Sequence, residues 1–220
     1  KRPTPGHTYM VSLDPSMGTG GDFAAIQIFE LPTFEQVGEW QHNMTPMNQQ
    51  VRILQQINKH IHDTIIEKDA SATPQIFYSM ENNTIGEAAL MRVMDIGEEN
   101  IMGMFLSEPI RKGHRRKFRR GFNTTAKFKI DACTKFKELV ESGKMKLNSQ
   151  LLISELKDFV ATGLSYKAKP GQHDDLVSAC LLMTRMMKVL ADFDPKIFEK
   201  WTDRSSEMTT PMPIFGNFYG

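Results

Sequence analysis

The chain has 220 residues, of which 40% are hydrophobic and 24% charged, and its formal net charge at pH 7 is +1. These values are typical of a globular protein with one substantial core. No apolar run approaches the roughly 20 residues that a membrane-spanning helix needs, and no signal-peptide pattern opens the chain. We therefore expect a soluble, intracellular protein that does not contact a membrane. Because residue 1 is lysine rather than methionine, we also expect it to be part of a longer protein.

The first third of the chain contains short apolar segments separated by turn residues. Residues 8–13, 23–30 and 36–42 are three such segments with short connections, which predicts an antiparallel meander. A long amphipathic helix is expected next, because apolar residues recur at three- or four-residue spacing. Its apolar positions are Met47, Val51, Leu54, Ile57, Ile61 and Ile65. A strand at 75–80 follows.

The remaining segments predict more helices than strands. In chain order they are a helix over about 85–94, a strand at 101–106, a long loop at 107–125, a helix over about 128–140, a short strand at 144–147, a short helix at 149–157, a hairpin centred on 162–163 and a long helix at 173–190. Cys133 and Cys180 fall inside two of the helical patterns, so we expect reduced core residues and no zinc site.

This order of elements predicts an α/β fold. The sheet is expected to be mixed, with its first three strands antiparallel and helices flanking it, which matches the ribonuclease-H-like (RuvC/resolvase-like) arrangement. We expect residues 1–195 to form this domain and residues 196–220 to be a weakly ordered C-terminal tail.

Acidic residues occur where these elements begin or end. Asp14 ends the first strand, Glu81 follows the fourth, and Asp174 and Asp175 lie in the first turn of the last helix. If the first and fourth strands are neighbours, their carboxylates emerge at one edge of the sheet, where the last helix can add its own. Such a cluster repels itself unless a cation compensates it, and hard oxygen ligands favour magnesium or manganese. The set predicts two ions about 4 Å apart that promote phosphodiester hydrolysis.

Within this set we assign separate roles. Asp14 is expected to bridge both ions, while Glu81 and the Asp174/Asp175 pair hold one ion each. Asp22 can reach a metal directly or through water, and His173 can contact the phosphate or orient a carboxylate.

Each residue also has an ordinary structural explanation. Asp22 fits turn chemistry, Glu81 can simply begin a loop, and acids at a helix N-terminus are favoured by capping and by the helix dipole. The metal hypothesis therefore depends on the whole set of acids in their order along the chain.

Four segments together resemble one known family. VSLDPSMGTGGDF, FYSMEN, TTAKFKIDACTKFKELVESGKMKL and GQHDDLVSA are similar to the C-terminal nuclease domain of large terminase subunits, the DNA-packaging motors of tailed double-stranded DNA bacteriophages. The likeness is strongest to the T-even-like branch and covers about residues 8–192. It implies a metal-dependent endonuclease that cuts concatemeric viral DNA into genome lengths.

Carried over by position, the resemblance places the family's acidic triad on Asp14, Glu81 and the Asp174/Asp175 pair, with Asp22 as the second acid of the first motif. The sequence does not decide which member of the pair is the principal ligand. The implied cofactors are Mg²⁺ or Mn²⁺, with two ions expected.

The resemblance also implies partners. These are double-stranded DNA, an N-terminal ATPase domain of the same full-length protein, the portal protein and the small terminase subunit, in the host cytoplasm at the procapsid portal. No G-x-x-x-x-G-K-[ST] motif occurs, so we expect this chain to have no packaging ATPase of its own.

A basic segment, RKGHRRKFRR at 111–120, provides candidate DNA contacts. Charge runs are often only solvated loops, but a carboxylate-rich cleft needs nearby cations to admit DNA. Phosphate contacts read no base sequence, so cutting with little sequence specificity is expected. The candidate residues are Arg111, Lys112, Arg115, Arg116, Lys117, Arg119 and Arg120, with Lys127, Lys129, Lys135 and Lys137 adding positive charge further along and Lys167 and Lys169 on a second rim.

Two other functions stay open at this point. One is a DNA-gripping module of the motor that does not cleave. The other is an ATPase of the actin or sugar-kinase type, because the segment LDPSMGTGGDFAAIQIF resembles the phosphate-binding hairpin of that class. That class also needs a second Gly-rich hairpin and an adenosine-binding segment, and we find neither in the sequence.

Overall fold

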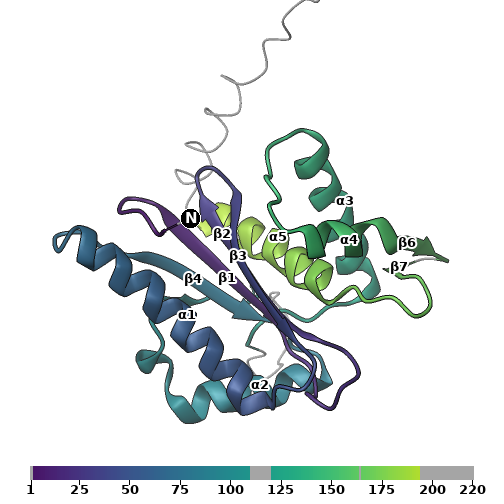
Figure 1. Cartoon of the computed structure of the whole chain (residues 1–220), viewed down its shortest axis with the longest axis horizontal. Coiled ribbons are helices and arrows are strands. Elements are labelled where there is room, and N and C mark those ends of the chain that lie inside the picture. Colours follow the sequence, from purple (N-terminus) through teal and green to yellow (C-terminus); the bar gives the residue numbers. More distant parts are fainter. Residues whose placement is uncertain (1, 110–119, 164, 194–220) are drawn as a thin grey trace, which may run out of the picture.

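The computed structural model describes residues 2–109, 120–163 and 165–193. The expected tail and most of the basic segment lie outside these residues. The described chain forms a five-stranded sheet with helices on both faces and a separate two-stranded hairpin (Figure 1). In chain order the elements are β1 Thr8–Asp14, β2 Ala24–Leu31, β3 Glu35–His42, α1 Met47–Lys68, β4 Gln75–Met80, α2 Thr84–Ile96, a 3₁₀ turn at Glu98–Asn100, β5 Met104–Phe105, α3 Ala126–Glu141, α4 Gln150–Asp158, β6 Phe159–Thr162, β7 Ser165–Ala168 and α5 Asp175–Phe193.

The strand order of the main sheet is β3-β2-β1-β4-β5. β1 and β2 pair antiparallel, as do β2 and β3, whereas β4 runs parallel to β1 and β5 parallel to β4. The predicted α/β class, the antiparallel first three strands and the adjacency of the first and fourth strands are therefore confirmed.

Alternation along β1 divides its side chains between the two faces. Tyr9, Val11 and Leu13 pack with α1 and α2 in one core, while Met10 lies in the second core with α3, α4 and α5. Ser12 points the same way as Met10, since its Oγ donates a 2.8 Å hydrogen bond to the Ala179 carbonyl of α5. Because side chains alternate with a period of two, Asp14 also belongs to the α5 face.

Helix α5 is the centre of the second core and packs against β1 and β2. Met183, Met186 and Met187 are buried there, where their flexible thioether side chains fill the core. Cys133 and Cys180 are buried and free, which confirms their predicted state.

Three local predictions were wrong. Residues 101–106 form a strand only at β5, because Ile101 ends the preceding 3₁₀ turn. Residues 144–147 make a single parallel bridge, Glu35 to Lys146, instead of a strand. The last helix begins at Asp175, so Asp174 precedes it instead of lying in its first turn.

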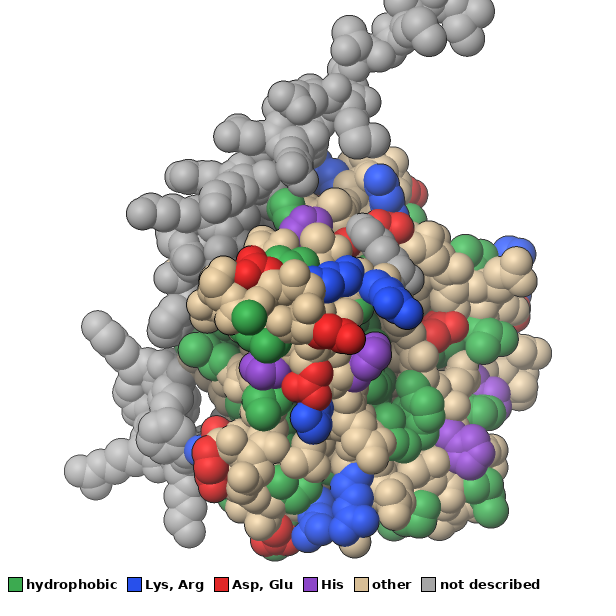
Figure 2. Space-filling model, turned by 60° about the vertical axis from the view of Figure 1, so that its left-hand side comes forward, with side chains coloured by type: hydrophobic (Ala, Val, Ile, Leu, Met, Phe, Trp, Pro, Cys, Tyr) green, Lys and Arg blue, Asp and Glu red, His purple; other side chains and the backbone are tan. Residues whose placement is uncertain are grey.

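The surface in Figure 2 shows acidic and basic side chains interspersed, with hydrophobic side chains between them. Among the described residues, no helix combines the length and apolarity needed to cross a membrane.

Gly86 in the first turn of α2 makes the tightest backbone approach near the end of β4. A Cβ added there would lie 1.8 Å from the Glu81 carbonyl oxygen. We predict that Gly86→Ala lowers the free energy of unfolding by about 1–3 kcal/mol, since overpacking outweighs the better helix propensity of alanine. Chemical denaturation measures this. Gly21→Ala is the control, because its Cβ would meet nothing within 4 Å, and equal stability of the two variants would contradict the prediction.

Candidate active site

Asp14 and Glu81 lie side by side at the ends of two parallel strands. The Glu81 N–H donates a 3.1 Å hydrogen bond to the Leu13 carbonyl, one step beyond the last β1–β4 pair, Leu13 with Met80. Phe77 packs against the core on the α5 side, so alternation along β4 directs Glu81 to that side as well. Strand pairing and pleat together bring two carboxylates to one edge and one face of the sheet.

The start of α5 brings two further acids to the same place. Asp175 Oδ2 accepts a 3.2 Å hydrogen bond from the Phe23 N–H, which ties α5 to the start of β2. The same oxygen lies 3.5 Å from His173 Nδ1. Asp174 Oδ2 accepts a 3.2 Å hydrogen bond from the Ala168 N–H at the end of β7. Each acid is thus fixed by a backbone amide from a different element.

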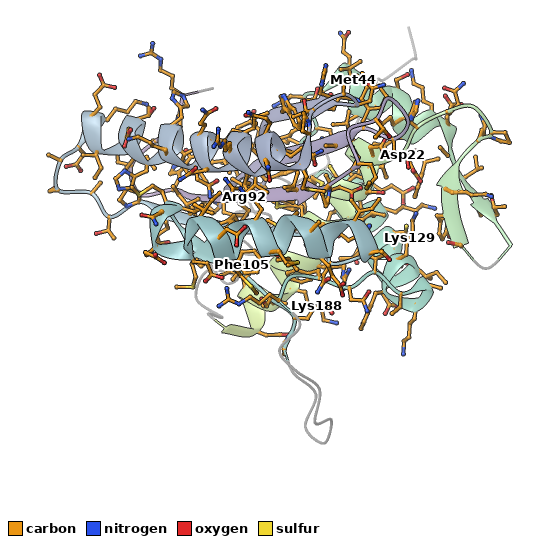
Figure 3. The ribbon with its side chains drawn as sticks, turned by 90° about the horizontal axis from the view of Figure 1, so that it is seen from below. Asp22, Met44, Arg92, Phe105, Lys129 and Lys188 are labelled. Carbon is orange, nitrogen blue, oxygen red and sulfur yellow. The ribbon has the colours of Figure 1, made fainter. Side chains whose placement is uncertain are left out.

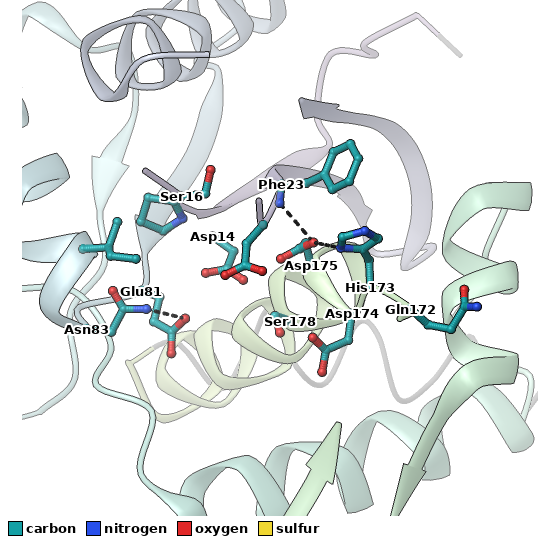
Figure 4. A pocket seen from close by; sticks show the side chains of 13 residues that line it. Asp14, Ser16, Phe23, Glu81, Asn83, Gln172, His173, Asp174, Asp175 and Ser178 are labelled. Carbon is teal, nitrogen blue, oxygen red and sulfur yellow. Dashed lines mark hydrogen bonds and ion pairs between the residues drawn. The ribbon is translucent and has the colours of Figure 1, made fainter. Parts of the chain in front are cut away.

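These acids line a common pocket of about 220 Å³. Figure 4 shows the carboxylates of Asp14, Glu81, Asp174 and Asp175 directed toward one shared space. The pocket lining consists of Asp14, Pro15, Ser16, Asp22, Phe23, Glu81, Asn83, Ile85, Gln172, His173, Asp174, Asp175 and Ser178. The structure therefore places all five predicted metal ligands and His173 around one cavity.

Burial makes this concentration of acids energetically costly. The pKa of Asp14 is raised well above its usual value, first because burial penalises its charge and then because Glu81, Asp175 and Asp174 repel it. The pKa of Asp175 is also raised, mainly by burial, although the Phe23 amide and His173 act in the opposite direction. A cation in the pocket would relieve both effects.

The donor set fits a hard divalent ion. It offers the carboxylate oxygens of five acids, two serine hydroxyls, two side-chain amides and one imidazole, and oxygen donors of this kind suit Mg²⁺ and Mn²⁺. Among the described residues, no group of three or more His, Cys, Asp or Glu side chains is close enough to hold a single ion by itself. Mg²⁺ sites commonly use one or two carboxylates, completed by water and substrate phosphate, so the spread of these acids suits an ion bound together with substrate.

Two residues that support the acids were missed by the sequence analysis. Asn83 caps α2 through the Gly86 N–H, and its side-chain amide donates a 3.4 Å hydrogen bond to Glu81 Oε2. An asparagine just before a helical pattern is a capping signal that could have identified it. Glu155 on α4 accepts a 3.1 Å hydrogen bond from the Val177 N–H in the first turn of α5, and burial raises its pKa to about 7. No local pattern marks Glu155, because its partner is 22 residues away.

The predicted DNA-binding cations that the structure describes lie in different settings. Arg120 pairs with Glu98, Lys129 with Asp174 and Lys169 with Asp158, while Lys127 and Lys167 are exposed. The others, Arg111, Lys112, Arg115, Arg116, Lys117 and Arg119, lie outside the described residues.

The described residues that flank the basic segment lie near Glu81. The Phe122 N–H donates to the Met80 carbonyl and the Asn82 N–H to the Phe122 carbonyl, so Phe122 lies alongside Glu81 in a parallel bridge. The Glu108 N–H donates to the Gly121 carbonyl. The described residues on both sides of the segment therefore lie at the sheet edge that carries the acids.

Comparison with known proteins places this arrangement in a family. The family model described as Terminase RNaseH-like domain matches residues 11–186, which include every pocket residue. The large terminase nuclease of thermophilic phage G20c with bound magnesium has a TM-score of 0.60 and 16% identity over 84% of each chain.

Two further structures have the same fold. The large terminase nuclease domain of Thermus phage P74-26 has a TM-score of 0.58 and 16% identity over 83% of this chain and 80% of that one. The manganese-soaked terminase nuclease domain of human cytomegalovirus has a TM-score of 0.54 and 15% identity over 81% of this chain and 82% of that one. The ribonuclease-H-like fold and the terminase resemblance are confirmed by these findings. The chain belongs to the Terminase RNaseH-like domain family.

Proposed function

We propose that this chain is the metal-dependent endonuclease domain of a large terminase subunit, which cuts concatemeric double-stranded DNA into genome lengths with little sequence specificity. The observation that carries the proposal is the convergence of carboxylates from β1, β4 and the start of α5 on one pocket. The magnesium-bound and manganese-soaked structures of related fold support it, since they concern terminase nucleases.

Five carboxylates would hold the ions. Asp14 and Glu81 would hold the ions together with Asp174 or Asp175, and Asp22 would assist directly or through water. When bound, the ions would lower the pKa of a water molecule and neutralise charge on the phosphate oxygens.

The chain's own residues prepare the hydrolysis. Asn83 orients Glu81, and the Phe23 and Ala168 amides fix the two aspartates. In the reaction, the oxygen of a water forms a bond to phosphorus while a P–O bond of the backbone breaks, leaving one phosphate end and one hydroxyl end. The water's proton passes to solvent, and the leaving oxygen takes up a proton. His173 is proposed to orient Asp175 or contact the phosphate.

The DNA is proposed to lie across the pocket, between the basic segment 111–120 and the β6–β7 hairpin with Lys167 and Lys169. The described residues that flank the segment, Glu108 and Phe122, support this path, because Phe122 lies alongside Glu81 and the Glu108 N–H donates to the Gly121 carbonyl. In the virus, the proposed partners are the ATPase domain of the same protein, the portal protein and the small terminase subunit, at the procapsid portal in the host cytoplasm.

The first prediction concerns Asp14 and Glu81. Changing either to alanine should lower metal-dependent nicking of supercoiled plasmid by at least about 1,000-fold, because each carboxylate would hold an ion, while DNA binding persists. Gel analysis with Mg²⁺ or Mn²⁺ measures the cutting. Thr64→Ala on α1 is a control that should cut normally. Full nicking by both acid variants would refute the metal assignment, and loss of cutting with retained binding separates a nuclease from a gripping module.

The second prediction follows from the raised pKa of Asp14. Its protonated form is favoured in the folded state, so its stabilising contribution is present at pH below its ordinary pKa and is lost as the pH rises through the raised one. In EDTA, the melting temperature of Asp14→Asn should therefore exceed that of the wild type at pH 8, by about 2–4 °C for each kcal/mol of repulsion removed. The difference should be smaller at pH 5. Calorimetry at several pH values measures this, and a variant that is less stable at every pH would contradict it.

The third prediction concerns the basic segment. Neutralising Arg115, Arg116, Arg119 and Arg120 together to glutamine should reduce the slope of log affinity against log salt by up to about 3.6, since each phosphate contact contributes about 0.9. Fluorescence anisotropy with duplex DNA measures the slope, and metal binding should not change. A variant with Arg52→Gln and Lys59→Gln on α1 is the control. An unchanged slope in the quadruple variant would refute the proposed DNA path.

A further inference from the structure

Lys129 in the first turn of α3 is the one lysine or arginine in the described part of the chain that forms an ion pair with a pocket carboxylate. Its Nζ lies 3.7 Å from Asp174 Oδ2, and the two side chains are 22% and 25% exposed. The pocket lining itself contains no lysine or arginine among the described residues. In Figure 3, Lys129 and Asp22 lie toward the same end of the molecule, whereas Arg92 lies nearer its middle.

The Lys129 ammonium is held only loosely. Its distance from Asp174 is longer than a hydrogen bond, and its other neighbour is the Phe159 ring of β6, 5.6 Å from Nζ to the ring centroid. Within the described residues it therefore has three N–H donors without an acceptor. Asp174, in contrast, is fixed by the Ala168 amide. If one partner moves, it is the lysine.

An ion bound at Asp174 would change the balance of charge around this lysine. The ion would neutralise the carboxylate that attracts Lys129 and would itself repel the ammonium. A DNA phosphate in the pocket offers the acceptor oxygens that the ammonium lacks, and a lysine can act as a mobile point charge toward phosphate.

We infer that Lys129 is a catalytic residue with two successive partners: it neutralises Asp174 while the pocket lacks a divalent ion, and it donates to the phosphate being cut once the ion is bound. This inference rests on the proposed nuclease function. It differs from a general DNA-gripping role because it assigns Lys129 opposite effects on metal binding and on cutting.

The test compares Lys129→Gln with Lys127→Gln in the purified chain. Lys127 is exposed in the same turn of α3 and forms no ion pair with a pocket acid. Without DNA, Lys129→Gln should bind Mn²⁺ about 3- to 10-fold more tightly than the wild type, because a positive charge near the ion is removed. Lys127→Gln should bind it as the wild type does. Isothermal titration calorimetry and the electron paramagnetic resonance of free Mn²⁺ measure this without reference to activity.

Cleavage of a short duplex should show the opposite effect. With Mn²⁺ saturating, Lys129→Gln should lower kcat about 100-fold with little change in KM, since the contact to phosphate matters most in the transition state. Lys127→Gln should lower only the salt-dependent affinity. Lys129→Arg should keep wild-type Mn²⁺ affinity and recover part of kcat.

The outcomes separate the two proposals. If the wild type neither binds Mn²⁺ nor cuts DNA, the nuclease function itself fails and takes the inference with it. If the wild type does both and Lys129→Gln behaves as Lys127→Gln does, only the inference fails. Weaker Mn²⁺ binding together with a lower melting temperature in Lys129→Gln would overturn the inference too, because it would show that Lys129 merely holds Asp174 in place.

Discussion

The parallel pairing of β1 with β4 is the constraint on which the site depends. The hydrogen bond from the Glu81 amide to the Leu13 carbonyl extends the ladder by one step and sets Glu81 beside Asp14. A slip of one residue would turn one of the two carboxylates to the α1 face, because side chains alternate along a strand. The two apolar cores on either side of the sheet hold this register, so they also hold two mutually repelling acids in place. The packing of the sheet against its two cores thus offsets the repulsion between the pocket carboxylates.

The start of α5 is held by several elements at once. The Phe23 amide of the chain entering β2 binds Asp175, the Ala168 amide of β7 binds Asp174, and Glu155 of α4 accepts from the Val177 amide. Asp174 and Asp175 therefore accept backbone hydrogen bonds and also face the pocket. From the sequence, capping chemistry and metal binding were competing explanations of these acids. In the structure they are compatible, because a carboxylate has several lone pairs and one backbone amide uses only one of them.

Much of the fold follows from local patterns in the sequence, and much of the site does not. The meander and the helices are visible in the spacing of apolar residues, and Asp14 and Glu81 could be matched because each ends a strand. The start of the last helix was harder to predict. HDDLV has a helical pattern from His173 onward, whereas α5 begins at Asp175 and Asp174, just before it, accepts a hydrogen bond from the Ala168 amide. β5 was overestimated because Ile101 is buried as the end of the 3₁₀ turn and not as part of a strand. The partners of Lys129 and Glu155 come from segments far apart in the chain, and no periodicity reveals such pairs.

Buried contacts also fix the chain on either side of the basic segment. Arg185 of α5, largely buried, pairs with Glu108, and its guanidinium carbon lies 5.2 and 5.0 Å from the ring centroids of Phe122 and Phe128. With the backbone bonds of Phe122, this contact fixes Glu108 and Phe122, which flank the segment, and Phe122 lies alongside Glu81. Removing the carboxylate partner of a buried arginine is strongly destabilising. The Arg185–Glu108 pair should therefore persist at salt concentrations that screen surface charges. The near-neutral net charge of the chain thus combines a basic segment of the sequence with an acidic pocket, and the described residues that flank the segment are anchored near that pocket.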